Sequence, residues 1–167
     1  MLAILMDLTF TYLSENESDS PVYKAALDIL VEHVEHPDPG SKFEQVVCSL
    51  GNCSPKAKIA KLLPQGFDAL LGLQNETIVS FLALKRRTAQ RPLGVFRVYT
   101  VPEYRNNGVA TRTVAHLVSD CFEKGHEQIY VSEGNHPGVV AVLRSVQRTY
   151  QGHAIEVQPE KGLIKRL

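Results

Sequence analysis

The segment from Arg105 to Thr111 combines the residue types that a phosphate-binding turn needs. It follows an apolar stretch ending at Val101 and precedes a segment with helical periodicity, so it joins a predicted strand to a predicted helix. Small residues at Gly108 and Ala110 let the backbone approach a ligand closely, and the first amides of a helix lack intrahelical partners. We therefore expect these amides, the helix dipole and the Arg105 guanidinium to bind an anionic phosphate.

Other interpretations of this turn are open on the pattern alone. A glycine between a strand and a helix is often just a tight turn, and an arginine there is often just a surface charge. Two familiar nucleotide-binding patterns fit less well. A Walker loop needs Gly-Lys-Ser/Thr, which is absent, and a dinucleotide fingerprint needs three glycines where this turn has one.

Local signals place the turn within an ordered series of helices and strands. Ser20-Pro21 and Ser54-Pro55 each combine an N-cap with a proline at the first helical position, and Ser41 to Glu44 has the form of a capping box. The first third is therefore predicted to be mainly helical. The remaining patterns predict a β-hairpin over 67–84, a strand over 95–101, a helix from about 110, a strand over 128–132, a helix over 137–148, and strands over 154–157 and 163–165.

The turn and its surroundings resemble the GNAT superfamily of N-acetyltransferases. That family has Arg/Gln-x-x-Gly-x-Gly/Ala between its fourth strand and the next helix, and Arg105, Gly108 and Ala110 fill the three defined positions. The resemblance covers roughly residues 66–167. It implies a single α/β (α+β) domain over 1–167, with a GNAT-like central mixed, mostly antiparallel sheet and helices on both faces. Residues 1–65 would be a mainly helical variable region, and 66–167 the acyl-CoA-binding core.

The resemblance implies acetyl-CoA as cosubstrate. The amides after the arginine would hold the pyrophosphate, and the main chain at the end of the preceding strand would pair with the pantetheine arm. Asn135, at the start of the next helix, would contact the pantetheine or the phosphates, although it could equally be a plain N-cap. The implied cofactor-binding residues are Tyr99, Thr100, Val101, Arg105, Asn106, Asn107, Gly108, Val109, Ala110, Thr111 and Asn135.

The implied reaction is direct attack of a primary amine on the thioester, which transfers an acetyl group to a small molecule or protein. Positioning supplies much of the acceleration, and a general acid and base supply the rest. The sequence departs from the family at the acid, because the position that is often tyrosine is Val142. Tyr150 is the remaining candidate for the acid, and Glu133 and His136 are candidates for the base. Alternatively, Tyr150 is a core tyrosine, and Glu133 and His136 are solvated residues at a helix start.

Composition excludes several classes of partner. Eighteen basic and eighteen acidic residues cancel, which disfavours nucleic acid, and no apolar run approaches the ~20 residues of a membrane span. Three cysteines without an export signal predict reduced thiols and a cytoplasmic protein. We expect no metal, because the possible zinc ligands, His33, His36, Cys48 and Cys53, match no established spacing.

Two further classes of function stay open beside the enzyme. The chain could bind acyl-CoA as a non-catalytic sensor or interaction module, which the valine at position 142 favours, or it could be a structural domain without a ligand. The acceptor is not determined: a protein N-terminus, a lysine, a polyamine, an amino acid and a drug-like amine are all compatible. A homodimer is an expectation by analogy only.

Overall fold

The computed structural model describes residues 7–36, 42–86, 93–132 and 136–167. The helices and strands, in chain order, are β1 (Thr9–Tyr12), α1 (Pro21–Glu35), α2 (Lys42–Cys48), α3 (Pro55–Leu62), β2 (Phe67–Gln74), β3 (Thr77–Lys85), β4 (Leu93–Thr100), α4 (Val109–Glu123), β5 (Gln128–Val131), α5 (Pro137–Thr149), β6 (Ile155–Gln158) and β7 (Leu163–Arg166). Short 3₁₀ helices are η1 (Leu13–Glu15), η2 (Leu63–Gln65), η3 (Pro102–Tyr104) and η4 (Pro159–Lys161).

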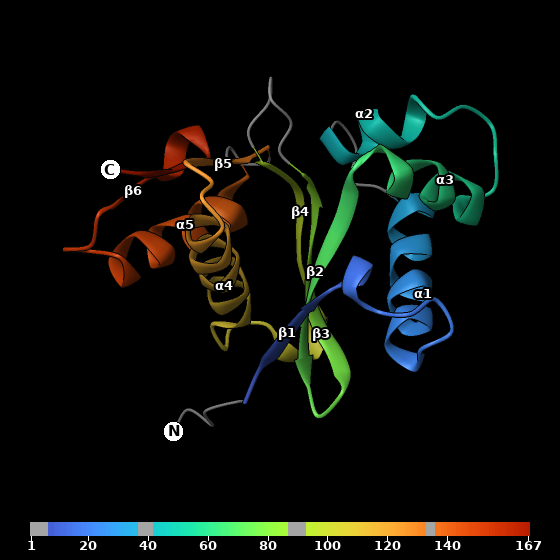
Figure 1. Ribbon diagram of the computed structural model, residues 1–167, viewed down its shortest axis with the longest axis horizontal. Coiled ribbons are helices and arrows are strands. Elements are labelled where there is room, and N and C mark those ends of the chain that lie inside the picture. The colour runs from blue at the N-terminus through green and yellow to red at the C-terminus, as the bar shows by residue number, and fades with distance from the viewer. Residues whose placement is uncertain (1–6, 37–41, 87–92, 133–135) are drawn as a thin grey trace.

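Within the described residues the strands form one seven-stranded sheet in the order β1-β2-β3-β4-β5-β7-β6. Every neighbouring pair is antiparallel except β4 with β5, which is parallel. Figure 1 shows α1, α2 and α3 on one side of the sheet and α4 and α5 on the other. The predicted mixed, mostly antiparallel sheet with helices on both faces is therefore confirmed.

Local signals account for the ends of several elements. The hydroxyl of Ser20 accepts a hydrogen bond from the amide of Tyr23, and Ser54 caps α3 in the same way, as predicted. The β2–β3 hairpin turns at Asn75 and Glu76, whose φ values of 49° and 65° suit the twist of a tight hairpin. The capping serine predicted for α2, Ser41, lies outside the described residues.

Two apolar layers hold the helices to the sheet. Leu82 belongs to the layer beneath α4 and α5, and its neighbour Phe81 belongs to the layer beneath α1, α2 and α3. Successive strand residues point to opposite faces, so a strand covered on both faces is apolar throughout. β3 fits this rule except at Ser80, since every residue from Ile78 to Leu84 is buried and the others are apolar.

The first turn of α4 is fixed to the sheet by a buried polar contact. Thr113 donates its hydroxyl hydrogen to the carbonyl of Val109 at 2.8 Å, and the hydroxyl of Ser80 on β3 lies 2.8 Å from that of Thr113. Ser80 is therefore the donor to Thr113. Gly72 on β2 leaves room for this pair, because a Cβ there would lie 2.3 Å from the Ser80 oxygen. The contact sets where α4 begins relative to β3.

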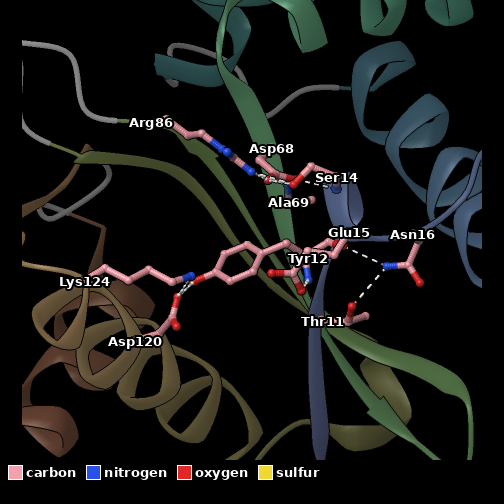
Figure 2. Close-up of polar contacts among 10 residues, drawn as sticks. All are labelled: Thr11, Tyr12, Ser14, Glu15, Asn16, Asp68, Ala69, Arg86, Asp120 and Lys124. Atoms are coloured by element: carbon pink, nitrogen blue, oxygen red, sulfur yellow. Dashed lines mark hydrogen bonds and ion pairs between the residues drawn. The ribbon is translucent and has the colours of Figure 1, made fainter.

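The N-terminal strand is held to the far end of α4 (Figure 2). The hydroxyl of Tyr12 donates to the carboxylate of Asp120 at 2.5 Å, and the ammonium of Lys124 lies 2.9 Å from the same oxygen. Burial alone would raise the pKa of Asp120, but the Tyr12 hydrogen bond and Lys124 outweigh it and lower that pKa. Burial and the Asp120 carboxylate raise the pKa of the Tyr12 phenol.

A second polar cluster in Figure 2 fixes the segment after β1. The carboxylate of Asp68, whose side chain is only 1% exposed, accepts from the amide of Ser14 at 3.0 Å and from Arg86 at 2.6 Å. A buried carboxylate is stable when it is both paired and hydrogen-bonded, and these contacts supply both conditions. The cluster therefore ties η1 to β2 and to the end of β3.

Candidate active site

The central feature of the site is a parting of β4 from β5. The two strands pair through Leu93, Gly94 and Val95 only, and the last contact is the amide of Ser132 donating to the carbonyl of Val95 at 2.8 Å. β4 continues to Thr100 while β5 ends at Val131. Within the part of the chain that the structure describes, the second half of β4 therefore has a strand partner on one edge only.

The open edge of β4 presents particular peptide groups. The amide of Val101 donates to the carbonyl of Val79 at 2.9 Å, so the peptide group of Val101 points toward β3. Peptide groups alternate along an antiparallel strand, and those of Thr100 and Val98 therefore point toward the open edge. Of the predicted residues Tyr99 to Val101, Thr100 is the one placed to bond an extended ligand through its main chain.

A cavity of about 740 Å³ lies at this edge. It is bounded by the end of β4, the loop through η3, the start of α4 and the first half of α5. It brings together most of the predicted site residues: Tyr99, Thr100, Arg105, Asn106, Gly108, Val109, Ala110, Thr111 and His136. Its lining also includes Arg97, Val98, Tyr104, Gly138, Val139, Ala141, Val142 and Ser145.

The α4 N-terminus opens onto this cavity. Gly108 is the N-cap, with φ of 72° and no capping side chain, and the amide of Arg112 is the first to bond back to it, through the Gly108 carbonyl. The amides of Val109, Ala110 and Thr111 consequently lack intrahelical acceptors and carry the positive end of the helix dipole. A Cβ on Gly108 would meet nothing within 4 Å, so the space above these amides is open. This is the geometry of an anion site.

The Arg105 guanidinium is positioned beside these amides. Its Nε donates to the carbonyl of Thr100 at 3.0 Å, and its central carbon lies 5.8 Å from the centre of the Tyr99 ring. The side chain of Asn107 instead donates to the carbonyl of Arg105 at 3.0 Å, and Asn107 and Val101 do not line the cavity. Asn107 therefore stabilises the loop, while Arg105 adds positive charge at the edge of the cavity.

His136 reaches the cavity as the N-cap of α5. Its Nδ1 accepts a hydrogen bond from the amide of Gly138 at 3.2 Å. A neutral imidazole that accepts at Nδ1 carries its hydrogen on Nε2. In this arrangement His136 can donate a hydrogen bond from Nε2, but it has no lone pair there to act as a general base.

The position that is often tyrosine in the family and the candidate acid Tyr150 lie in different places. Val142 lines the cavity, whereas Tyr150 lies at the C-terminal end of α5 and does not. The Tyr150 hydroxyl donates to the carbonyl of Ala115 at 2.9 Å and lies 2.8 Å from the hydroxyl of Ser119. It therefore joins α5 to α4, and the structure does not bring it to the other predicted site residues.

The remaining predicted residues and the possible metal ligands are placed as follows. Glu133 and Asn135 lie outside the described residues. Among the described residues no three or more His, Cys, Asp or Glu side chains are grouped to hold a metal ion. His33, considered above as a zinc ligand, is buried with its ring against those of Phe81 and Tyr99. In the same part of the chain, no helix is long and apolar enough to cross a membrane.

Sequence reasoning assigned no role to three polar residues of the cavity, Arg97, Tyr104 and Ser145. Arg97 follows a bulge in β4: Arg97 pairs with Ala83 and Val95 with Leu84, which leaves Phe96 as the extra residue. No local sequence signal marks this bulge. The only available hint was an arginine within an otherwise apolar strand.

Comparisons with known proteins agree with this geometry. A family described as the Acetyltransferase (GNAT) family matches residues 49–143. One solved structure is an aminoglycoside acetyltransferase from an uncultured soil metagenomic sample, in complex with sisomicin. It is 16% identical to this chain with a TM-score of 0.57, and the match covers 85% of this chain and 88% of that protein. The ribosomal-protein-S18-alanine N-acetyltransferase from Escherichia coli has 13% identity and a TM-score of 0.56, covering 84% and 76%.

A third solved structure, an aminoglycoside 6'-N-acetyltransferase complexed with coenzyme A, has 16% identity and a TM-score of 0.50. The match covers 75% of this chain and 61% of the length of that protein. No curated protein matches the chain. At these identities the structural likeness establishes the fold, and the family match covers the hairpin, β4, the Arg105–Ala110 turn and the start of α5. The chain therefore belongs to the GNAT acetyltransferase family.

Proposed function

We propose that this chain transfers an acetyl group from acetyl-CoA to a primary amine by direct attack. The observation that carries the proposal is the cavity in which the uncapped N-terminus of α4 meets the open edge of β4. One element offers amides for a pyrophosphate, and the other offers peptide groups for an extended amide-containing arm. A solved relative of the same fold is complexed with coenzyme A, which supports this choice of ligand.

Each end of the donor has defined partners in this proposal. The amides of Val109, Ala110 and Thr111 hold the pyrophosphate, and Arg105 contributes a charge-assisted bond from the cavity edge. The peptide group of Thr100 pairs with the pantetheine arm. This arrangement directs the thioester toward the point where β4 and β5 part, close to the bulge at Phe96.

The reaction requires a bond to form between the amine nitrogen and the thioester carbon, and the carbon–sulfur bond to break. The amine loses a proton and the departing thiolate gains one. Holding the two reactants together in the cavity supplies much of the acceleration. Among the residues on the cavity wall, His136 can donate from Nε2 to the donor molecule. Glu133, which lies outside the described residues, stays a candidate for the base.

A second candidate function is binding of acyl-CoA without transfer. The observation that favours it is Val142, which places an apolar side chain on the cavity wall where the family often has a tyrosine. Tyr150 does not replace that hydroxyl, since its own is bonded to the carbonyl of Ala115. Turnover of any amine, detected as free CoA thiol, would exclude this candidate.

The first test of the donor site is a thermal-shift titration of the protein with acetyl-CoA and with CoA. A ligand that binds only the folded state raises the midpoint of unfolding by mass action. Gly108→Asp should abolish the shift, because it places a carboxylate over the helix amides where phosphate would bind. Gly108→Asn introduces a side chain of similar size that tolerates positive φ but carries no charge, so this variant should retain more of the thermal shift.

Gly125→Asp is the matched control for backbone strain. Gly125 follows the other end of α4, has φ of 86°, and would likewise meet nothing within 4 Å of an added Cβ. Both aspartate variants place a side chain at positive φ, and Gly125→Asp also puts a negative charge at the C-terminal end of α4, but only Gly108→Asp should lose the response to acetyl-CoA. An unchanged response in Gly108→Asp would refute the site, and no response of the native protein to millimolar ligand would refute the function.

A further inference from the structure

The open edge of β4 is partly occupied by a side chain of the same protein. The Nε of Arg105 donates to the carbonyl of Thr100 at 3.0 Å, and the guanidinium carbon lies 5.8 Å from the centre of the Tyr99 ring. Tyr99 packs against the apolar layer beneath α1, α2 and α3, which lie on the opposite side of the sheet from α4 (Figure 1). These two contacts hold the guanidinium of Arg105 against the edge of β4.

The contact falls on the main-chain group proposed to bind the pantetheine arm. The amide of Val101 donates to Val79 on β3, so the peptide group of Thr100 points to the open edge instead. An extended ligand that pairs with this edge needs the Thr100 carbonyl as an acceptor for its amide N–H group. Because that carbonyl already accepts from Arg105, the ligand and the side chain compete for it.

A second position for the guanidinium lies within the same cavity. Arg105 and the free amides of the first turn of α4 line one cavity. The Arg105 side chain is exposed, so it can turn about its own bonds without disturbing the core. A phosphate bound at the amides would attract the guanidinium through charge and through charge-assisted hydrogen bonds. Such a phosphate would therefore draw Arg105 away from Thr100 and free the carbonyl.

We propose that Arg105 makes binding of the acyl donor depend on the phosphates of the donor. Without a phosphate at α4, the guanidinium occupies the Thr100 carbonyl and closes the edge of β4. With a phosphate there, the guanidinium turns to the anion and the edge accepts the pantetheine arm. This inference rests on the function proposed above. It implies that the site selects thioesters of CoA over thioesters that carry the same arm without a phosphate.

The size of the effect follows from the fraction of molecules with an open edge. A ligand that needs a minor state binds more weakly in proportion to the population of that state. One hydrogen bond and one exposed cation–π contact leave roughly one molecule in five to ten open. Removing the Arg105 side chain should therefore strengthen the binding of pantetheine by about 5- to 10-fold. The same change should weaken the binding of CoA, because the charge-assisted bond to phosphate is lost.

The first test measures dissociation constants for CoA and for pantetheine by isothermal titration calorimetry of the full chain. In Arg105→Ala the constant for CoA should rise by about 3- to 10-fold, while the constant for pantetheine falls. Arg105→Lys keeps the charge but has a methylene group where arginine has Nε. This variant should bind CoA more tightly than Arg105→Ala does, and should bind pantetheine more tightly than the native protein does.

The second test adds inorganic pyrophosphate to the pantetheine titration. In the native protein, saturating pyrophosphate should draw Arg105 away and strengthen pantetheine binding by about 3- to 10-fold. In Arg105→Ala the same addition should have no such effect, because the competing side chain is gone. A side chain that only supported the loop between β4 and α4 would not couple the two ligands.

Arg144→Ala is the matched control, because Arg144 is an exposed residue of α5 that pairs with Glu160 and does not line the cavity. It should leave both dissociation constants unchanged. Two results would overturn the inference while leaving the proposed function intact. The first is pantetheine binding that is no tighter, or is undetectable, in Arg105→Ala. The second is an absence of coupling between pyrophosphate and pantetheine in a native protein that binds CoA. If the native protein does not bind CoA, the proposed function itself fails.

Discussion

Gly72→Ala tests whether the contact between β2, β3 and α4 fixes the start of α4. The added Cβ would lie 2.3 Å from the Ser80 hydroxyl oxygen and 3.3 Å from that of Thr113. The first distance is far below van der Waals contact, so the Ser80 side chain must move. Ser80 and Thr113 are both fully buried, and moving Ser80 breaks its hydrogen bond to Thr113.

The expected loss of stability follows from three effects. Overpacking in a core costs about 1–3 kcal/mol, and leaving a buried hydroxyl without its partner costs about 1–3 kcal/mol. Replacing glycine restricts the unfolded chain and offsets about 0.4–1 kcal/mol. We therefore expect Gly72→Ala to lower the free energy of unfolding by about 1–5 kcal/mol. Ser80→Ala removes the clashing oxygen and should itself cost about 1 kcal/mol.

The double variant Gly72→Ala/Ser80→Ala is the decisive measurement. Without the Ser80 oxygen the most severe clash is removed and the closest atom is the Thr113 oxygen at 3.3 Å. The double variant should therefore be more stable than Gly72→Ala alone, and the coupling should be about 1–2 kcal/mol. Gly94→Ala is the matched control within the same sheet. Its Cβ would meet only the Phe96 ring, at 3.7 Å, which is ordinary contact.

Urea unfolding at 25 °C gives these free energies if the slope with denaturant stays constant among the variants. The acetyl-CoA thermal shift should also weaken in Gly72→Ala, because the amides at the start of α4 are displaced. The reasoning would be refuted if Gly72→Ala were as stable as Gly94→Ala, or if the effects of the two substitutions in the double variant were simply additive.

Two further predictions concern the anchor of β1 and the proton donor. Tyr12→Phe should lower the free energy of unfolding by about 1–2 kcal/mol at pH 7. In the native protein the Tyr12 hydrogen bond lowers the pKa of folded Asp120 below its ordinary value of 3.8. The stability that this bond adds is therefore present above pH 3.8 and is lost as the pH falls through the folded pKa of Asp120. Urea titrations of the two proteins should converge below about pH 4, and a constant difference down to pH 2 would contradict this account. Val142→Tyr should raise kcat at least about tenfold by placing a phenol in the cavity, whereas an unchanged kcat would mean that water or another donor already protonates the thiolate.

Local sequence signals predicted the elements well because their causes lie within a few residues. A serine followed by proline fixes a helix start, and the caps at Ser20 and Ser54 form as expected. The same is true of the turn at Gly108, where positive φ and a helix start are both local properties. The element order and the family resemblance then predicted the mixed sheet correctly.

Residues that act through non-local contacts were not identifiable in this way. The role of Gly72 depends on Ser80 and on a helix far along the chain, and its position in a strand carries no sign of that contact. Tyr150 was a candidate acid by sequence distance alone. The packing of α5 against α4 places its hydroxyl on the carbonyl of Ala115 instead.

The sequence by itself therefore determined the helices, the hairpin, the order of elements and the turn at Gly108, since each depends on local conformational preference and hydrophobic period. Only the tertiary structure decided which residues share the cavity. The parting of β4 from β5 and the bulge at Phe96 depend on strand register, which is set by pairing between distant segments. That register sets the face of the sheet on which Arg97 lies, and no pattern within β4 could have shown it.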